Sequence, residues 1–216
     1  MKTILTPLQN KFLAEFFELT SDFWLTGGTA LSAFYLHHRY SEDLDLFTDK
    51  DDVFQKVDQP VNQACQMLNI ESIPIRITTF FKHFQIGTIE ESLTLHFSKD
   101  YTPHIKPPMV ANNIIVDSII DITTNKICAA LGRTEIKDLI DLYFLDRAGY
   151  TIADYFEAAQ QKDGGLTYES LAYTLSQFEI SEIPPFMIKS VSIAELQQFL
   201  DSTIEWLIRK STPPIQ

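Results

Sequence analysis

The pattern of hydrophobic and polar residues changes once along this chain, near residue 117. Before that point, segments that alternate with the period of two of a half-buried strand are mixed with segments that have the 3.6-residue period of amphipathic helices. After it, almost every segment has the helical period. We therefore predict an α+β fold, with a mixed β-sheet and flanking helices in residues 1–116 and a helical lobe in residues 117–216.

Most of the helices are predicted by their start and stop signals. A capping box at Thr6, followed by proline, begins the first helix, and Asp49 caps a second that runs to about residue 68 and that Pro60 kinks or splits. In the second part, another capping box begins the last helix at Ser192. The other helices predicted there cover residues 121–131, 136–147, 153–161 and 167–178.

Alternating β-branched residues predict three successive strands in the middle of the first part, at residues 73–80, 83–89 and 92–97. Because the turns between them are short, we expect them to pair antiparallel with one another and with a strand at residues 43–47. Three prolines predict a loop over residues 98–110, and residues 114–116 are expected to form one further short strand.

The segment 24–47 contains a turn that suits a phosphate ligand. Gly27 and Gly28 follow a short buried strand and precede a helix predicted over residues 29–39. Without a Cβ, these glycines allow a ligand to approach the backbone closely. The first amides of the helix also present the positive end of its dipole.

The strand that ends this segment carries two carboxylates. Asp43 and Asp45 are two residues apart, so their side chains project from the same face of the strand. Such pairs hold divalent cations in phosphoryl transfer. Arg39 and Ser41 are expected to support this strand by hydrogen bonds. Each feature alone is commonly structural, but the order of strand, glycine turn, helix and carboxylate strand favours the functional interpretation.

A second cluster lies in the helical part. Asp121 and Lys126 form a D-x4-K pattern on one helix, whereas Asp138 and Asp141 are three residues apart on the next and share a face. From spacing alone, helix-end charges and a surface ion pair explain these residues. Arg133 is equally explained as a charge at the C-terminal end of a helix.

The sequence GGTAL at residues 27–31, followed by HRYSEDLDLF at residues 38–47, resembles the AbiEii/AbiGii-type nucleotidyltransferase toxins, a branch of the DNA polymerase β-like superfamily. The resemblance implies a nucleotidyltransferase-like sheet. It also implies that the glycine turn binds a nucleoside triphosphate and that the D-x-D pair holds one or two Mg²⁺ ions. The matching residues are Gly27, Gly28, Thr29, Asp43 and Asp45.

The same resemblance extends to the helical part, where Lys126 and Asp138 match the active-site lysine and acid of these toxins. It implies that the helical lobe completes the active-site cleft. A lysine there would offset charge on the triphosphate, and the acid would orient the lysine or accept a proton. Arg133 is then a candidate second phosphate contact.

One position departs from the wider superfamily, in which a third carboxylate often lies on a later strand. The best candidate strand here offers His96 instead, and imidazole suits softer metals than Mg²⁺. Asp100 and Asp117 are the alternatives for this carboxylate.

The resemblance predicts transfer of a nucleoside monophosphate from an NTP to an acceptor hydroxyl, by a toxin of a toxin–antitoxin or phage-defence system with a cognate antitoxin. The acceptor is a tRNA, or otherwise a protein or a small molecule. Two alternatives stay open. One is a catalytically impaired module of the same fold that binds a nucleotide or an antitoxin, and the other is an aminoglycoside-type nucleotidyltransferase.

Composition narrows the partners further. The 216 residues carry a formal net charge of −12, which disfavours non-specific binding to nucleic acid, so DNA is not an expected partner. A hydrophobic content of 45% with 16 phenylalanines indicates a folded protein. Cys65 and Cys128 provide no disulfide framework, and no apolar run is long enough to span a membrane, so we expect a cytoplasmic protein.

Overall fold

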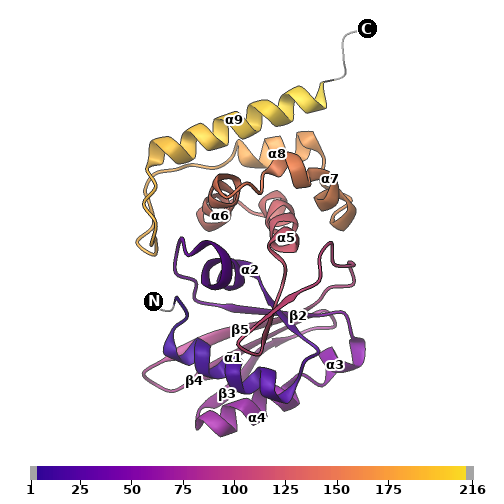
Figure 1. The fold of residues 1–216 in the computed structure, drawn as a ribbon, viewed down its shortest axis with the longest axis vertical. Coiled ribbons are helices and arrows are strands. Elements are labelled where there is room, and N and C mark those ends of the chain that lie inside the picture. Colours follow the sequence, from indigo (N-terminus) through magenta and orange to yellow (C-terminus); the bar gives the residue numbers. More distant parts are fainter. Residues whose placement is uncertain (1–3, 213–216) are drawn as a thin grey trace. The chain divides into compact units, whose positions relative to one another are not determined.

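A computed structural model describes residues 4–212 of the chain. These residues belong to two compact units, the first ending at Ile119 and the second beginning at Ile120 (Figure 1). The first unit contains a seven-stranded mixed sheet with helices, and the second is helical. The predicted α+β fold is therefore confirmed.

The sheet has the strand order β3-β4-β5-β2-β1-β7-β6. Its strands are β1 (Trp24–Thr26), β2 (Leu44–Thr48), β3 (Glu71–Ile77), β4 (Phe81–Gly87), β5 (Ser92–Lys99), β6 (Met109–Ala111) and β7 (Ile114–Val116). Strand β2 lies at the centre, antiparallel to β1 and parallel to β5. This order places the carboxylate strand between the strand that precedes the glycine turn and the strand that carries His96.

Two predictions about the sheet were wrong. Strand β4 is antiparallel to both β3 and β5 as expected, but β5 is parallel to β2. The connection from β2 to β3 contains helices, and such a long crossover lets the chain return in the same direction. In addition, the end of the predicted proline-rich loop forms β6, which pairs with β7 across a turn at Asn112 and Asn113, both with positive φ.

The helices of the first unit are α1 (Pro7–Leu19), α2 (Gly27–Ala30), the π-helix η1 (Leu31–Leu36), α3 (Asp51–Gln55) and α4 (Asp58–Leu68). The capping box at Thr6 is confirmed. The predicted helix over 49–68 is split, which was one of the two outcomes expected from Pro60. The two helices meet near Lys56, and Lys50 precedes the first in place of Asp49. Pro60 lies in the first turn of α4, where a proline is tolerated because its missing N–H has no helical partner.

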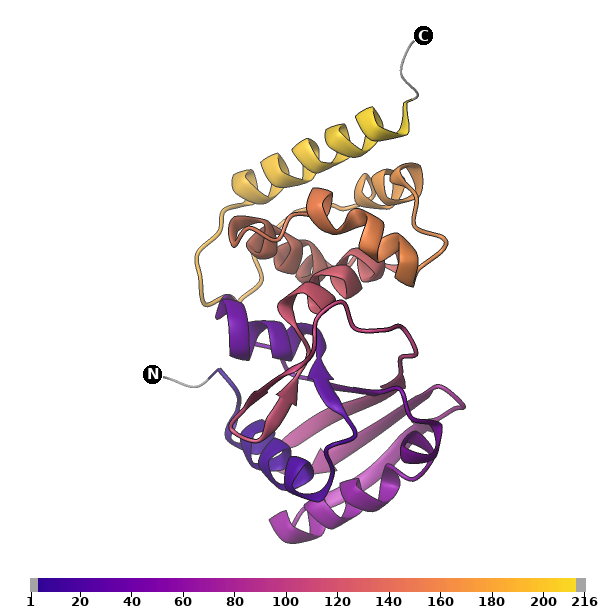
Figure 2. The same cartoon turned by 45° about the vertical axis from the view of Figure 1, so that its right-hand side comes forward.

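Helices α1 and α4 lie against one face of the sheet (Figures 1 and 2). The core there is rich in aromatic side chains; for example, the rings of Phe16 and Phe97 are 5.6 Å apart. As a result, β2, β4 and β5 alternate between fully buried residues, which face these helices, and half-buried residues on the opposite face. We call this second side the half-buried face, and it carries Asp45 and His96.

The helical unit contains α5 (Ile119–Gly132), α6 (Ile136–Arg147), α7 (Ile152–Lys162), α8 (Tyr168–Leu175) and α9 (Ile193–Ser211). All five match predicted helices, and the capping box at Ser192 is confirmed. Their apolar faces share one core around Phe156 and Leu171. Within residues 4–212, the structure has no helix with the length and apolar character that crossing a membrane requires.

Candidate functional site

The glycine turn joins β1 to α2, and one side chain of the protein packs against each of its glycines. Gly27 has a φ of +70°, and a Cβ at this residue would overlap the carboxylate of Asp45. A Cβ on Gly28 would overlap Nη2 of Arg39. Glycine at both positions therefore lets a carboxylate and a guanidinium pack directly against the turn. The sequence had suggested another reason, the close approach of a ligand.

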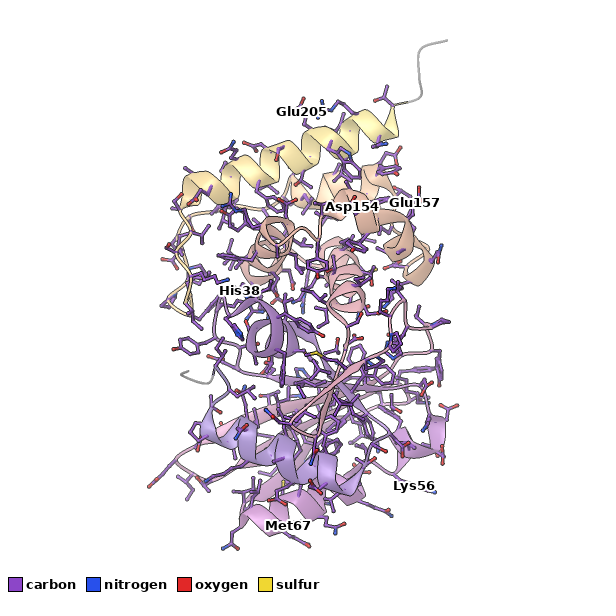
Figure 3. The ribbon with its side chains drawn as sticks, in the orientation of Figure 1. His38, Lys56, Met67, Asp154, Glu157 and Glu205 are labelled. Atoms are coloured by element: carbon purple, nitrogen blue, oxygen red, sulfur yellow. The ribbon has the colours of Figure 1, made fainter. Side chains whose placement is uncertain are left out.

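Arg39 reaches the turn because the helix that follows Gly28 ends early. The predicted helix over 29–39 continues only as the π-helix η1, and His37 then adopts a left-handed conformation with a φ of 52°. Single π-turns are frequent at functional sites. His38, which is labelled in Figure 3, follows this reversal. It is completely buried, and its Nδ1 is 3.4 Å from the hydroxyl oxygen of Ser32. The Arg39 side chain is also buried, and its Nη1 donates to the carbonyl of Tyr40 at 2.9 Å.

The two aspartates lie next to this turn. Asp45 is on β2, directly opposite Thr26 of β1, and its side chain is 31% exposed. Asp43 precedes β2 by one residue, and its carbonyl accepts a hydrogen bond from the hydroxyl of Thr29. This bond connects the glycine turn to the D-x-D segment. The predicted residues Gly27, Gly28, Thr29, Asp43 and Asp45 are therefore neighbours in the structure.

The expected neighbour of the D-x-D strand is confirmed, since His96 pairs with Asp45 across β5 and β2. Its Nδ1 is 3.2 Å from Oδ1 of Asp45, so the carboxylate can orient the imidazole. Sequence reasoning missed His83, which pairs with His96 from β4. Burial and the nearby His96 lower the pKa of His83, and the charge of Asp43 acts in the opposite direction. The Nε2 atom of His83 is buried without a hydrogen-bond partner.

The two alternative carboxylates have different surroundings. Asp117 follows β7 and is 1% exposed, and its carboxylate accepts hydrogen bonds from the Thr26 hydroxyl at 2.8 Å and the Ser118 N–H at 3.0 Å. Asp100 follows β5, and its carboxylate accepts from the backbone of Thr102. Neither pairs with Asp45 in the sheet; that position belongs to His96.

The helical unit contains a separate charged cluster. Nζ of Lys126 is 3.0 Å from Oδ1 of Asp138 and 2.6 Å from Oδ2 of Asp141, and both carboxylates are fully buried. Arg133 donates from Nε to Oδ2 of Asp138 at 2.7 Å. Two cations therefore neutralise two buried anions, as burial of charge requires. The predicted residues Lys126, Arg133 and Asp138 are brought together, and Asp141 joins them.

Asp121, the first residue of the D-x4-K pattern, has a partner that sequence spacing did not indicate. Its buried carboxylate is 3.3 Å from Nζ of Lys162 on α7, and the same Nζ contacts Asn125. The two residues are 41 positions apart, so only the packing of α7 against α5 brings them together.

A family model described as nucleotidyl transferase AbiEii toxin, type IV toxin–antitoxin system, matches residues 11–207. No curated protein sequence matches the chain. Three solved structures share the fold. JHP933 from Helicobacter pylori is 21% identical, with a TM-score of 0.59 over 94% of this chain and 90% of its own.

A second structure, described as a nucleotidyltransferase of H. pylori, is 20% identical, with a TM-score of 0.58 over 95% of this chain and 97% of its own. The third is the nucleotidyltransferase toxin MenT4 of Mycobacterium tuberculosis. It is 12% identical, with a TM-score of 0.54 over 96% of this chain and 83% of its own. At these identities the likeness concerns the fold alone.

Proposed function

Because the chain belongs to the AbiEii family of nucleotidyl transferase toxins of type IV toxin–antitoxin systems, we propose that it transfers a nucleoside monophosphate from an NTP to an acceptor hydroxyl in a Mg²⁺-dependent reaction. One observation carries the assignment of the site. The Asp45 carboxylate lies against Gly27, so a cation ligand and the turn assigned to the triphosphate are immediate neighbours.

The residues at this site fit the metal that the family implies. Asp43 and Asp45 are partly accessible, and carboxylate oxygens are ligands that Mg²⁺ prefers. We assign the ion to these two residues. When bound, Mg²⁺ would neutralise phosphate charge and stabilise the leaving pyrophosphate.

The protein's own groups then position the nucleotide. We assign the phosphates to the turn formed by Gly27, Gly28 and Thr29, where the buried guanidinium of Arg39 supplies positive charge. The hydrogen bond from Thr29 to the carbonyl of Asp43 holds this turn in position relative to the aspartates. A fixed spacing between phosphate ligands and cation ligands is what phosphoryl transfer requires, because most of its catalysis is positioning.

Lys126, Asp138 and Arg133 remain predicted functional residues. Lys126 is 7% exposed and held by two carboxylates, which fits the predicted role of Asp138 in orienting the lysine. The same contacts also serve stability, so substitution of Lys126 alone does not separate the two roles.

A tRNA is the first acceptor to test, with proteins and small molecules as further outcomes. Purified protein is incubated with each radiolabelled NTP, Mg²⁺ and total RNA, and with total protein in parallel. Transfer by the wild type, and its loss in Asp43→Asn/Asp45→Asn, supports the proposal. Equal labelling by both proteins contradicts the assignment of the site. The role in phage defence is tested by the phage resistance of cells that carry the toxin with its antitoxin.

Nucleotide binding without turnover is the second candidate function. It is favoured by His96, which lies beside Asp45 where relatives often carry a third carboxylate. Thermal unfolding with and without NTP and Mg²⁺ distinguishes the two functions. Stabilisation by the nucleotide with no transfer to any acceptor identifies a binding module.

A further inference from the structure

A row of side chains crosses the half-buried face from the proposed catalytic aspartate to the edge of the sheet. The register pairs Asp45 with His96, His96 with His83, and His83 with Arg76 on β3. Partners that lie opposite each other in neighbouring strands project from the same face of a sheet. The row therefore continues the site from β2 across β5 and β4, away from the glycine turn.

In this region, the ring of His96 contacts two other rings. The centroid of the His96 ring is 5.0 Å from that of His83 and 5.3 Å from that of Phe81. The His96 side chain is 25% exposed, and Phe81 and His83 are also half-buried, so the rings are partly accessible. We call Phe81, His83 and His96 the ring shelf.

The direction of the reaction decides what the ring shelf can hold. In an in-line displacement, the attacking and leaving oxygens lie on opposite sides of the phosphorus. The strand order β4-β5-β2-β1 places the glycine turn on one side of Asp45 and the ring shelf on the other. If the turn holds the leaving pyrophosphate, the acceptor hydroxyl must approach from the opposite side of Asp45, where β5 and β4 lie.

We propose that the ring shelf is the acceptor subsite and that it stacks a nucleobase next to the attacking hydroxyl. This inference rests on the proposed function, because it takes the glycine turn as the triphosphate site. Aromatic and imidazole rings stack on bases of any sequence.

The charges on this face support a nucleic-acid acceptor. Although the chain has a net charge of −12, none of the residues that β4 and β5 place on the half-buried face is acidic. These residues are Phe81, His83, Gln85, Thr94, His96 and Ser98. Arg76, at the exposed end of the row, is a cation that suits a phosphate of the acceptor backbone.

The test is the binding of a fluorescein-labelled single-stranded RNA with a cytidine-cytidine-adenosine 3′ end, measured by anisotropy with the full chain. An RNA of the same length with abasic sites at that end serves as the second probe. In Phe81→Leu/His83→Leu, the affinity for the base-bearing RNA is expected to fall at least about fivefold, the smallest effect of losing one stacked base. The affinity for the abasic RNA is expected to stay unchanged.

Two further variants separate stacking from structure. Phe81→Tyr/His83→Phe keeps both rings and is expected to bind the base-bearing RNA like the wild type. Phe80→Leu is the matched control, because Phe80 is 61% exposed and its ring lies beside Lys99 instead of on the ring shelf. This control is expected to leave the affinity unchanged.

Several results would overturn the inference. One is equal binding of the two RNAs by the wild type, and another is equal RNA binding by Phe81→Leu/His83→Leu and the wild type. A loss of NTP-dependent thermal stabilisation in the leucine variant would instead assign the shelf to the base of the NTP. Failure of the proposed function gives a different result, in which the wild type transfers no nucleotide whatever the RNA affinities are.

Discussion

Each of the two units contains a pair of closely spaced aspartates, but their surroundings differ. In the first unit, Asp45 is 31% exposed and contacts an imidazole and a glycine turn. In the second, Asp138 and Asp141 are fully buried and are neutralised by Lys126, with Arg133 also bound to Asp138. A D-x-D and a D-x-x-D motif look alike in sequence, so exposure and counter-charge decide which carboxylates can bind a cation and which hold the fold together.

This difference has an energetic basis. An accessible carboxylate keeps much of its hydration and can exchange water for a metal ion or a substrate. A buried carboxylate has lost its hydration and depends on its partners, so removing one partner destabilises the fold by about 3–5 kcal/mol. The two pairs should therefore respond to substitution in opposite ways.

The largest expected change in stability follows substitution of Lys126. Lys126→Met removes the cation that contacts both buried carboxylates, so the free energy of unfolding should fall by about 3–5 kcal/mol. Denaturant unfolding measures this change. A variant that unfolds like the wild type would show that the buried ion pairs contribute little.

Charge compensation then separates stability from catalysis. In Lys126→Met/Asp138→Asn/Asp141→Asn, no charge remains on these three residues, so stability should recover most of the loss. If Lys126 or Asp138 also acts in catalysis, nucleotide transfer stays low in this variant although the protein is folded. Recovery of transfer together with stability would make the cluster purely structural.

The next effect is expected at the glycine turn. Alanine at Gly27 meets both a left-handed backbone and the Asp45 carboxylate, whose cheapest response is to rotate away from the turn. Gly149→Ala is the matched control, because Gly149 has a φ of +88° and nothing lies within 4 Å of the place of its Cβ. Both variants should lose about 1–3 kcal/mol of stability from backbone strain.

Only Gly27→Ala should also lose nucleotide transfer, since only that variant displaces a proposed metal ligand. Transfer rates and thermal unfolding of the two variants measured side by side make the comparison. Equal transfer rates in the two variants would show that catalysis does not depend on the position of the Asp45 carboxylate.

The smallest effect concerns Cys65, an ionisable group that burial in α4 keeps uncharged. Burial raises the pKa of the Cys65 thiol from 9.0 to about 11, so the unfolded chain loses this proton at a lower pH than the folded one. The contribution of Cys65 to stability should therefore be constant below pH 9 and decline between pH 9 and pH 11, by at most about 1.4 kcal/mol per pH unit. Denaturant unfolding should show that the free energy of unfolding declines less in Cys65→Ala than in Cys128→Ala between pH 9 and pH 11. Equal declines in the two variants would contradict this role of Cys65.

The sequence predicted the element types well, because period and caps are local. Thr6 and Ser192 begin their helices as their capping boxes indicate. The sequence did not predict features that depend on contacts between segments distant along the chain, such as the parallel pairing of β5 with β2. The π-helical end of the helix after Gly28 also lacked a signal in the residue pattern.

The candidate site shows the same limit. The motif residues of the glycine turn and the D-x-D segment were predicted from their spacing, and the structure brings them together. The role of Arg39 against Gly28 was not predicted, because it depends on the chain reversal at His37. His83 was missed although its alternation placed it on a strand, because only the register shows that it faces His96.

The most direct test of the contrast between the two aspartate pairs is a matched set of isosteric substitutions. Nucleotide transfer and the free energy of unfolding are measured on the same preparations of Asp43→Asn/Asp45→Asn and Asp138→Asn/Asp141→Asn. The first variant should lose transfer at least about a hundredfold and keep its stability within about 0.5 kcal/mol, whereas the second should lose several kcal/mol of stability. If the first variant keeps its activity, the accessible carboxylates are not the catalytic ones. If it loses as much stability as the second, the contrast between the two pairs is contradicted.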